Sequence, residues 1–156
     1  MDVFAGCLDL STMQVDKNNK TYDSRNDCNA IIETTKNTLI SGCKNTKIPS
    51  SVTSIGSSAF IGCGLTSITI PSSVTTIGDS GFTWCTSLKS VNFMGNVSTI
   101  EKDMFYGCTS LESITISNSV TNIKEDVFYD CSSLTNVEIG EGMVFLGNGT
   151  FWSVVV

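Results

Sequence analysis

Cysteine is the residue type in this chain with the greatest capacity for chemistry, because a thiolate can attack a substrate, ligate a metal or pair in a disulfide. The 156 residues include seven cysteines. Five of them stand three residues after a phenylalanine: Cys7, Cys63, Cys85, Cys108 and Cys131. Such regular spacing would bring neighbouring sulfurs close enough for a disulfide or a shared metal.

A structural role for this series explains the spacing better. Cysteine buries as a small apolar residue, and Val154 stands at the same position after the last phenylalanine. We therefore predict buried free thiols, no metal site and no cofactor. Cys28 and Cys43 lie outside the series and are the expected pair if the chain forms a disulfide, and the odd total leaves at least one thiol unpaired in a monomer.

The other titratable residues give little support for catalysis. The chain has no histidine, which removes the commonest general base, the usual catalytic triads and the zinc sites that contain histidine. Carboxylates are scattered through the expected turns, at Asp79, Asp103, Glu125 and Asp126, without forming a column on an inner face. The sequence therefore predicts that the chain is not an enzyme.

Phenylalanines recur at a nearly constant interval. The separations along the series Phe60, Phe82, Phe105, Phe128 and Phe151 are 22, 23, 23 and 23 residues. Similarity at a fixed period is typical of a repeat architecture, in which each unit forms one coil of a solenoid. The elements that place the cysteines are therefore expected to be repeated coils.

The aligned repeats share columns of apolar residues. The spacing Leu-x-x-Val-x-Ile ends in period-two alternation, which predicts a short strand with inward side chains. A second short extended segment follows at Val-Thr-x-Ile, and the segment around each Phe and Cys is predicted to be a tight turn or a single helical turn. The columns are Leu65, Leu88, Leu111 and Leu134; Ile68, Val91, Ile114 and Val137; Ile70, Phe93, Ile116 and Ile139; Val74, Val97, Val120 and Met143; Ile77, Ile100, Ile123 and Leu146.

Stacking these coils would bury the columns as continuous seams, so the predicted fold class is a repeat solenoid, mostly β, with short strands stacked into a parallel sheet. The segment IPSSVTSIGSSAFIGCGLTSITI, from Ile48 to Ile70, and its successors through Cys131 resemble the BspA-like leucine-rich repeat family. The resemblance covers about two-thirds of the chain. It implies a leucine-rich-repeat fold, a cell-surface or secreted location and a role in adhesion or protein binding, often to host extracellular matrix, without catalytic residues.

The regular pattern is interrupted near the N-terminus. We expect one domain, 1–156, with a partial first coil at 1–15, an insertion at 16–47 and regular coils at 48–156. Within the insertion, the flanks of Thr35-Lys36-Asn37 read as a hairpin with a three-residue loop. We interpret it as a variant coil carrying a β-hairpin.

Two rows of exposed residues are candidate binding surfaces. The first row is the outward positions of the predicted strands, with polar flanking residues: Thr69, Asn92, Thr115 and Glu138, flanked by Ser67, Ser90, Ser113 and Asn136. The alternative is a solvated sheet face that binds nothing. The second row is the aromatic residues Trp84, Tyr106, Tyr129 and Trp152, which could stack on sugars or anchor a protein, or could simply pack one coil on the next.

Charge and hydropathy exclude several partners. A formal charge of −6 without a basic cluster disfavours nucleic acid. No apolar run reaches the roughly 18 residues that cross a bilayer, and the N-terminus lacks the pattern of a signal peptide. Neither end resembles a polar cap, so we expect a fragment of a longer array, with weak end-to-end self-association through the exposed Val154-Val155-Val156 end. The function predicted is a protein-binding or adhesion module; the alternatives are a carbohydrate-binding surface and a structural spacer.

Overall fold

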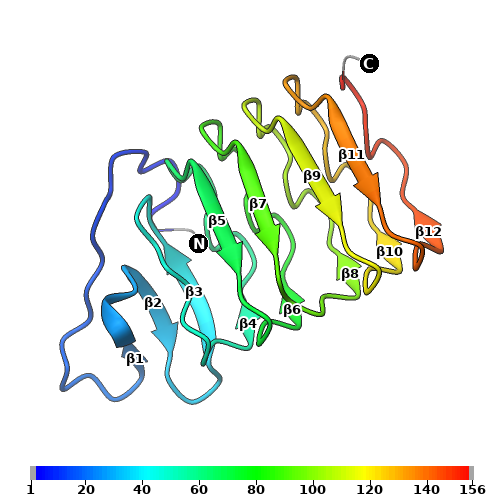
Figure 1. Ribbon diagram of the computed structural model, residues 1–156. Coiled ribbons are helices and arrows are strands. Elements are labelled where there is room, and N and C mark those ends of the chain that lie inside the picture. Colours follow the sequence, from blue (N-terminus) through cyan, green and yellow to red (C-terminus); the bar gives the residue numbers. More distant parts are fainter. Residues whose placement is uncertain (1–2, 155–156) are drawn as a thin grey trace.

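The computed structural model describes residues 3–154 and shows a solenoid of stacked coils (Figure 1). Four parallel strands, one per coil, lie along one side, which we call the strand face: β5 (Ser67–Ile70), β7 (Ser90–Phe93), β9 (Ser113–Ile116) and β11 (Asn136–Ile139). Val155 and Val156, part of the end considered above, lie outside the described residues.

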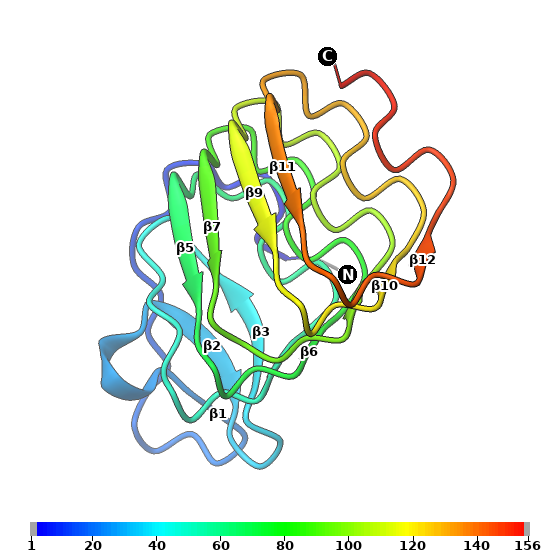
Figure 2. The ribbon, with the colours of Figure 1, turned by 45° about the vertical axis from the view of Figure 1, so that its right-hand side comes forward.

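A second row of two-residue strands follows the strand face around each coil (Figure 2). These strands are β4 (Ser54–Ile55), β6 (Thr76–Ile77), β8 (Thr99–Ile100), β10 (Asn122–Ile123) and β12 (Phe145–Leu146). They also pair in parallel with their neighbours, with β4 on β6 and with β10 between β8 and β12. The predicted second extended segment is therefore confirmed.

Alternation of apolar and polar side chains explains the strand face. In β5, Ile68 and Ile70 are buried, whereas Ser67 and Thr69 are exposed. The predicted inward columns are buried from Leu65 to Leu134, apart from the half-buried Phe93. Together they form one continuous core, as expected when each coil buries the inner face of its neighbour.

The segment around each phenylalanine is a turn with a distinctive backbone. The residues two before and two after each Phe adopt left-handed conformations, with φ of 56° at Ser58 and 61° at Gly62 in the Phe60 coil. The same alternation recurs at Ser80 and Trp84, Asp103 and Gly107, Asp126 and Asp130, and Gly149 and Ser153. The predicted turn is thus confirmed, and the helical alternative is excluded for these segments.

This alternation directs three backbone N–H groups of each turn toward the next coil. In the first regular coil, Ser58, Phe60 and Gly62 donate to carbonyls of the following turn at 3.0, 2.9 and 2.8 Å. We call this series the turn ladder. Both strand rows are interrupted between the second and third regular coils, since β6 does not pair with β8 nor β7 with β9. The turn ladder continues there, with the Phe82 N–H 2.9 Å from the Met104 oxygen.

Phenylalanine rings stack through the centre of the solenoid. Successive centroids along the series Phe60, Phe82, Phe105, Phe128 and Phe151 are 5.0, 5.5, 5.6 and 5.4 Å apart. The rings are within 12° of parallel. Stacking at these distances adds to the burial energy of each ring. The period seen in the sequence is therefore the spacing that keeps these rings in one column.

The predicted hairpin is confirmed, with one correction. It consists of β2 (Ala30–Glu33) and β3 (Thr38–Gly42), and β1 (Tyr22–Asp23) pairs with its outer edge. A single 3-10 turn, η1 (Arg25–Asp27), joins β1 to β2. Glu33 pairs with Thr38, so the loop has four residues, 34–37, and not three.

The hairpin is integrated into the solenoid. β3 runs parallel to β4, with Thr38 opposite Ser54, and so extends the second row of strands by one coil. This variant coil passes from β3 directly to Cys43 and omits the turn. The N-terminal segment supplies a turn in its place, because the Gly6 N–H bonds to the Ile61 oxygen at 3.2 Å.

Candidate binding surfaces

The strand face brings the first predicted row together. Thr69 lies opposite Asn92, and Thr115 lies opposite Glu138, so the outward residues are aligned within each of the two strand pairs, β5 with β7 and β9 with β11. All four are exposed, as are the flanking positions Ser67, Ser90, Ser113 and Asn136. Thr115 Oγ1 donates to Glu138 Oε2 at 3.3 Å. The result is a strip of hydroxyls, amides and one carboxylate on a backbone held by parallel pairing.

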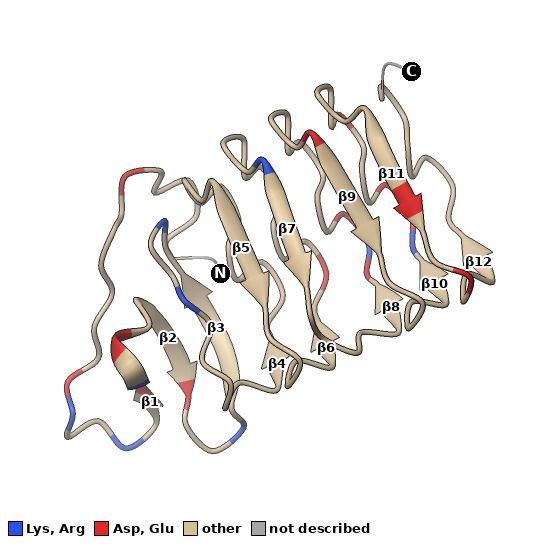
Figure 3. Ribbon diagram, viewed as in Figure 1, with Lys and Arg blue, Asp and Glu red and all other residues tan. Residues whose placement is uncertain are grey.

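Charge is unevenly distributed along this side of the molecule (Figure 3). At the start of β7 and β9, Lys89 and Glu112 form an exposed pair at 3.6 Å. The carboxylate of Glu138 lies on β11, while Lys44 and Lys47 lie on the segment that faces β5 across a hollow. The strand face is therefore acidic toward β11 and basic beside β5.

The aromatic row forms a second stack on the turns. The rings of Tyr106 and Tyr129 are 4.8 Å apart and 1° from parallel, and Trp84 meets Tyr106 edge-on at 5.3 Å. The facing sides of the two tyrosines therefore cover each other and are closed to a sugar ring. This geometry favours the packing interpretation for the tyrosines. Trp84 and Trp152 remain 46% and 63% exposed.

Trp84 stands two residues after its phenylalanine, whereas the other members of the aromatic row stand one residue after theirs. The structure explains this difference. It occupies the left-handed position two residues after Phe82, with φ of 58°, where the neighbouring coil has Gly107. A Cβ at Gly107 would meet the indole ring at 2.5 Å. The glycine thus provides the space in which Trp84 packs.

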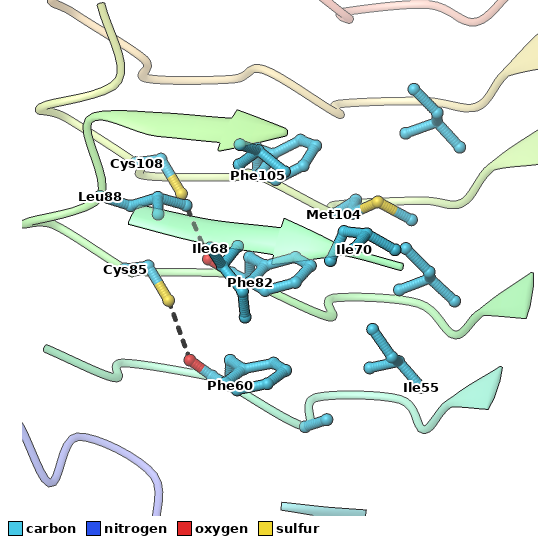
Figure 4. Packing of buried hydrophobic residues seen from close by; sticks show 14 of the residues in the cluster. Ile55, Phe60, Ile68, Ile70, Phe82, Cys85, Leu88, Met104, Phe105 and Cys108 are labelled. Atoms are coloured by element: carbon cyan, nitrogen blue, oxygen red, sulfur yellow. Dashed lines mark hydrogen bonds between the residues drawn. The ribbon is translucent and has the colours of Figure 1, made fainter. Parts of the chain in front are cut away.

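Three cysteines of the regular series have a backbone partner in the preceding coil. The thiols of Cys85 and Cys108 donate to the phenylalanine carbonyl of the preceding coil at 2.9 and 3.2 Å (Figure 4). The Cys131 thiol donates likewise to the Phe105 oxygen at 3.2 Å. Burial raises the pKa of Cys63 to about 11 and that of Cys85 and Cys131 to about 12. These sulfurs are protonated at neutral pH, which opposes both nucleophilic attack and metal ligation. Cys7 differs, because its side chain is exposed.

Cys28 and Cys43, the pair considered for a disulfide, are buried free thiols in the structure. Cys28 Sγ lies 3.7 Å from the Ala30 oxygen, and Cys43 Sγ lies 3.2 Å from the Asn29 oxygen. Across residues 3–154, no cluster of three or more acidic or cysteine side chains is arranged to hold a metal ion. The disulfide stays a prediction, which thiol labelling under denaturing conditions tests.

The carboxylates that are scattered in the sequence lie near one another in the stacked turns. Burial, followed by the charges of Asp126, Asp79 and Glu125, raises the pKa of Asp103, against the opposing effect of Lys102. Asp103 and Asp126 both occupy left-handed positions, where a short polar side chain is well tolerated. Their recurrence therefore has a backbone explanation.

Two hollows lie near the N-terminal side of the solenoid, and one of them is lined in part by Ser67 and Thr69 of the first predicted row. One, of about 630 Å³, lies between the segment 44–48 and β5. The other, of about 370 Å³, lies between the hairpin and the N-terminal segment and is lined by Phe4, Tyr22, Ile31 and Ile40 among others. Sequence reasoning did not identify either, since both arise where the regular stacking meets the variant coil.

Comparison with known proteins identifies the repeat. The profile described as "BspA type Leucine rich repeat region" matches residues 34–155 in six copies, which is more than half of the chain. Among curated proteins, no significant match was found. Within residues 3–154, no helix has the length and apolar character needed to cross a bilayer.

Several solved structures share the fold. A leucine-rich repeat protein from Bacteroides ovatus is 35% identical with a TM-score of 0.68, over 75% of this chain and 31% of its own length. One from Eubacterium ventriosum is 22% identical with a TM-score of 0.71, over 99% of this chain and 55% of its own. The leucine-rich repeat protein of T. pallidum is 25% identical with a TM-score of 0.71, over 92% and 70%. The chain therefore spans about a third to a half of the first two proteins.

Proposed function

This chain belongs to the BspA-type leucine-rich repeat family, and on that premise we propose that it is a non-enzymatic protein-binding module of a cell-surface or secreted protein. Host extracellular matrix proteins are the proposed partners, through adhesion. Families of this kind are repeat scaffolds, and scaffolds of one fold serve many partners, so the argument for binding has to come from the surface itself.

The observation that carries the proposal is the exposed polar strip of the strand face. Thr69, Asn92, Thr115 and Glu138 project from four strands whose backbone is fixed by stacking. A rigid surface loses little conformational entropy on binding, so each polar contact contributes more of its energy to affinity. The buried thiols and the absence of histidine give no comparable support to a catalytic role.

The test is binding of the purified chain to a panel of immobilised matrix proteins and glycans. A triple variant, Thr69→Lys with Asn92→Lys and Thr115→Lys, adds three bulky charges to the strand face. The matched control places the same changes on the exposed residues Thr53, Thr75 and Ser98, which precede the second row of strands. We expect saturable binding to a matrix protein that the first variant loses and the control retains.

Other outcomes point to the alternatives. Binding to a glycan that falls when Tyr106→Ala and Tyr129→Ala are combined would support a carbohydrate-binding surface. Absence of binding to every member of the panel would contradict adhesion and favour a structural spacer. Equal loss in both triple variants would show a general effect of added charge and would also contradict a specific role for the strand face.

We further propose weak end-to-end self-association. The last coil leaves large apolar side chains exposed, with Ile139 at 47%, Val144 at 83%, Phe145 at 50% and Leu146 at 47%. Contiguous exposed apolar residues are typical of interaction surfaces. Light scattering over a range of concentrations should show mass above that of a monomer, and a strictly monomeric mass at high concentration would contradict the proposal.

A further inference from the structure

A groove of about 630 Å³ separates the segment 44–48 from β5, the first strand of the strand face. β5 pairs with β7 on one side, and within residues 3–154 no strand pairs with its other side. One edge of the strand face is therefore open. The wall of the groove opposite β5 is formed by Lys44, Asn45, Thr46, Lys47 and Ile48, with Asn29 beside them.

Local sequence explains why the segment 44–48 does not close this edge. After β7 and after β11, the next residue bonds back to the preceding coil: Met94 N–H to the Ile70 oxygen at 2.9 Å and Gly140 N–H to the Ile116 oxygen at 2.9 Å. Pro71 holds this position after β5 and has no N–H to donate. The bond that would fasten β5 to the variant coil is therefore missing.

Thr46 reinforces the separation. It stands two residues before Ile48, as Ile68 stands two before Ile70, so a hydroxyl replaces an inward apolar group. Its Oγ1 donates to the Asn29 oxygen and accepts from the Cys43 N–H, both at 2.7 Å. The Lys47 N–H likewise bonds back to the Cys28 oxygen at 3.0 Å. These hydrogen bonds attach the segment to the variant coil and away from β5.

The groove is basic in a chain that carries a formal charge of −6. Lys44 and Lys47 are both exposed and line it. Lys44 has a long contact of 3.9 Å with the fully exposed Asp9, a geometry that contributes little binding energy. No salt bridge in the described part of the chain involves Lys47. Its charge is available to a ligand.

We propose that this groove binds an extended, acidic peptide segment of a partner protein, which pairs its main chain with the open edge of β5 and places carboxylates near Lys44 and Lys47. Addition of a strand to an open sheet edge is an established mode of peptide recognition, in which the main chain supplies affinity and the side chains supply selectivity. The proposal rests on the proposed function of protein binding and names a site and a partner chemistry for it.

The experiment is selection from a displayed library of random dodecapeptides on the intact chain, followed by affinity measurements on the enriched peptides. The test variant combines Lys44→Glu and Lys47→Glu. The matched control combines Lys17→Glu and Lys20→Glu, at two exposed lysines of the insertion that do not line the groove. Thermal unfolding of both variants verifies that the fold is retained, since all four side chains are exposed.

We expect enriched peptides with several Asp or Glu residues and no Pro within the binding stretch. Their affinity should fall on the order of tenfold or more in the groove variant and by less than twofold in the control, because the groove variant replaces attraction by repulsion. Hydrogen exchange should show new protection of amides in 67–70. Peptides without acidic enrichment, equal affinity for the groove variant, or protection elsewhere would overturn the proposal.

A separate variant distinguishes this inference from the function proposed above. Asn92→Lys with Thr115→Lys alters the strand face without touching a residue that lines the groove. Peptides selected on the groove should bind this variant with unchanged affinity, whatever the matrix panel shows. The library needs no natural ligand, so a negative matrix panel would refute the proposed partner without affecting this result.

Discussion

The regular coils and the variant coil at the N-terminus satisfy their backbone groups in different ways. In the regular coils, each turn donates to the next turn, and the thiols of Cys85, Cys108 and Cys131 donate to the phenylalanine carbonyl of the preceding coil. The same pairs of positions are therefore hydrogen-bonded from one coil to the next. One set of residue choices, repeated, is enough to extend the array.

The variant coil has no identical neighbour on its outer side and depends on side chains instead. Ser24 Oγ donates to the Ala30 oxygen at 2.7 Å and accepts from the Val15 N–H at 3.0 Å. Arg25 binds both carboxylate oxygens of Asp23, at 2.7 and 2.6 Å, and reaches Asn37 Oδ1 at 2.7 Å. The comparison shows that interrupting the repeat requires specific polar contacts, whereas continuing it requires regular spacing.

Truncation of the central ring column should have the largest effect. Phe105→Ala removes a fully buried ring that stacks on Phe82 and Phe128, and we expect a loss of about 3–5 kcal/mol in the free energy of unfolding. Urea denaturation measures it. Phe151→Ala is the control, because this ring is half-buried and stacks on one side, so its loss should be clearly smaller. Equal losses would show that the regular region does not derive its stability from stacking.

Gly42→Ala tests the junction between the two regions. An added Cβ would overlap with the ring of Phe60, the first member of the column, and we expect a loss of about 1–3 kcal/mol by overpacking. Gly6→Ala is the control for a glycine in open space, where a Cβ meets nothing within 4 Å. Its φ of 73° should cost about 1 kcal/mol through the backbone alone. Thermal unfolding compares the two, and a loss for Gly42→Ala below that for Gly6→Ala would contradict this account of the junction.

The ion pair of the variant coil predicts a pH dependence. Hydrogen bonding by Arg25 lowers the pKa of Asp23 to about 2, below its unfolded value of roughly 3.9, so the stabilisation is present above about pH 4 and is lost as pH falls toward 2. Asp23→Asn should lower the free energy of unfolding by about 1–2 kcal/mol at pH 7, and the difference from wild type should vanish near pH 2. Denaturant titrations at several pH values measure it.

Asp103→Asn in the regular region should behave in the opposite sense. Burial raises the pKa of this carboxyl, so its charged form is disfavoured in the fold, and removal of the charge should cause no loss in the free energy of unfolding at pH 7.

The Asp23 prediction has its own contradicting outcome. A difference in stability between the Asp23 variant and wild type that persists unchanged at pH 2 would show that the ion pair does not stabilise the variant coil.

Thiol labelling tests accessibility and not stability. The exposed Cys7 of the N-terminal segment should react, and the buried cysteines of the regular coils should not. In the native chain at pH 8, iodoacetamide should modify Cys7 and leave Cys63, Cys85 and Cys131, whose pKa values burial raises to about 11, 12 and 12. Peptide mapping by mass spectrometry identifies the sites. Under denaturing, non-reducing conditions all seven cysteines should react, and failure of Cys28 and Cys43 to react would establish the disulfide.

The sequence predicts the regular region well because the same pattern of apolar residues recurs in each coil. The alignment of Leu65, Ile68 and Ile70 with later coils identifies the inward residues, and period-two alternation identifies the outward rows. The left-handed turn positions escape this reasoning. Ser58, Ser80 and Trp84 are not residue types that usually adopt a positive φ. The turn ladder to the next coil imposes this conformation.

The variant region is predicted only in outline. Alternating apolar residues indicate the hairpin, but the length of its loop depends on whether Thr34 belongs to the strand or to the loop. The groove beside β5 depends on the missing N–H of Pro71 and on a single inward hydroxyl at Thr46, and both become significant only when the coils are placed side by side. Features that occur once leave no pattern in the sequence.

The turn ladder gives the solenoid a direction. Its N–H groups all point toward the C-terminal coil and its carbonyls toward the N-terminal coil, so the aligned peptide dipoles give the column a positive and a negative pole. Another copy that stacks on the last coil through this ladder must present carbonyls, which means its own N-terminal side. Such contacts are heterologous and build open head-to-tail fibres, whereas a closed two-fold dimer through this ladder would oppose donor to donor.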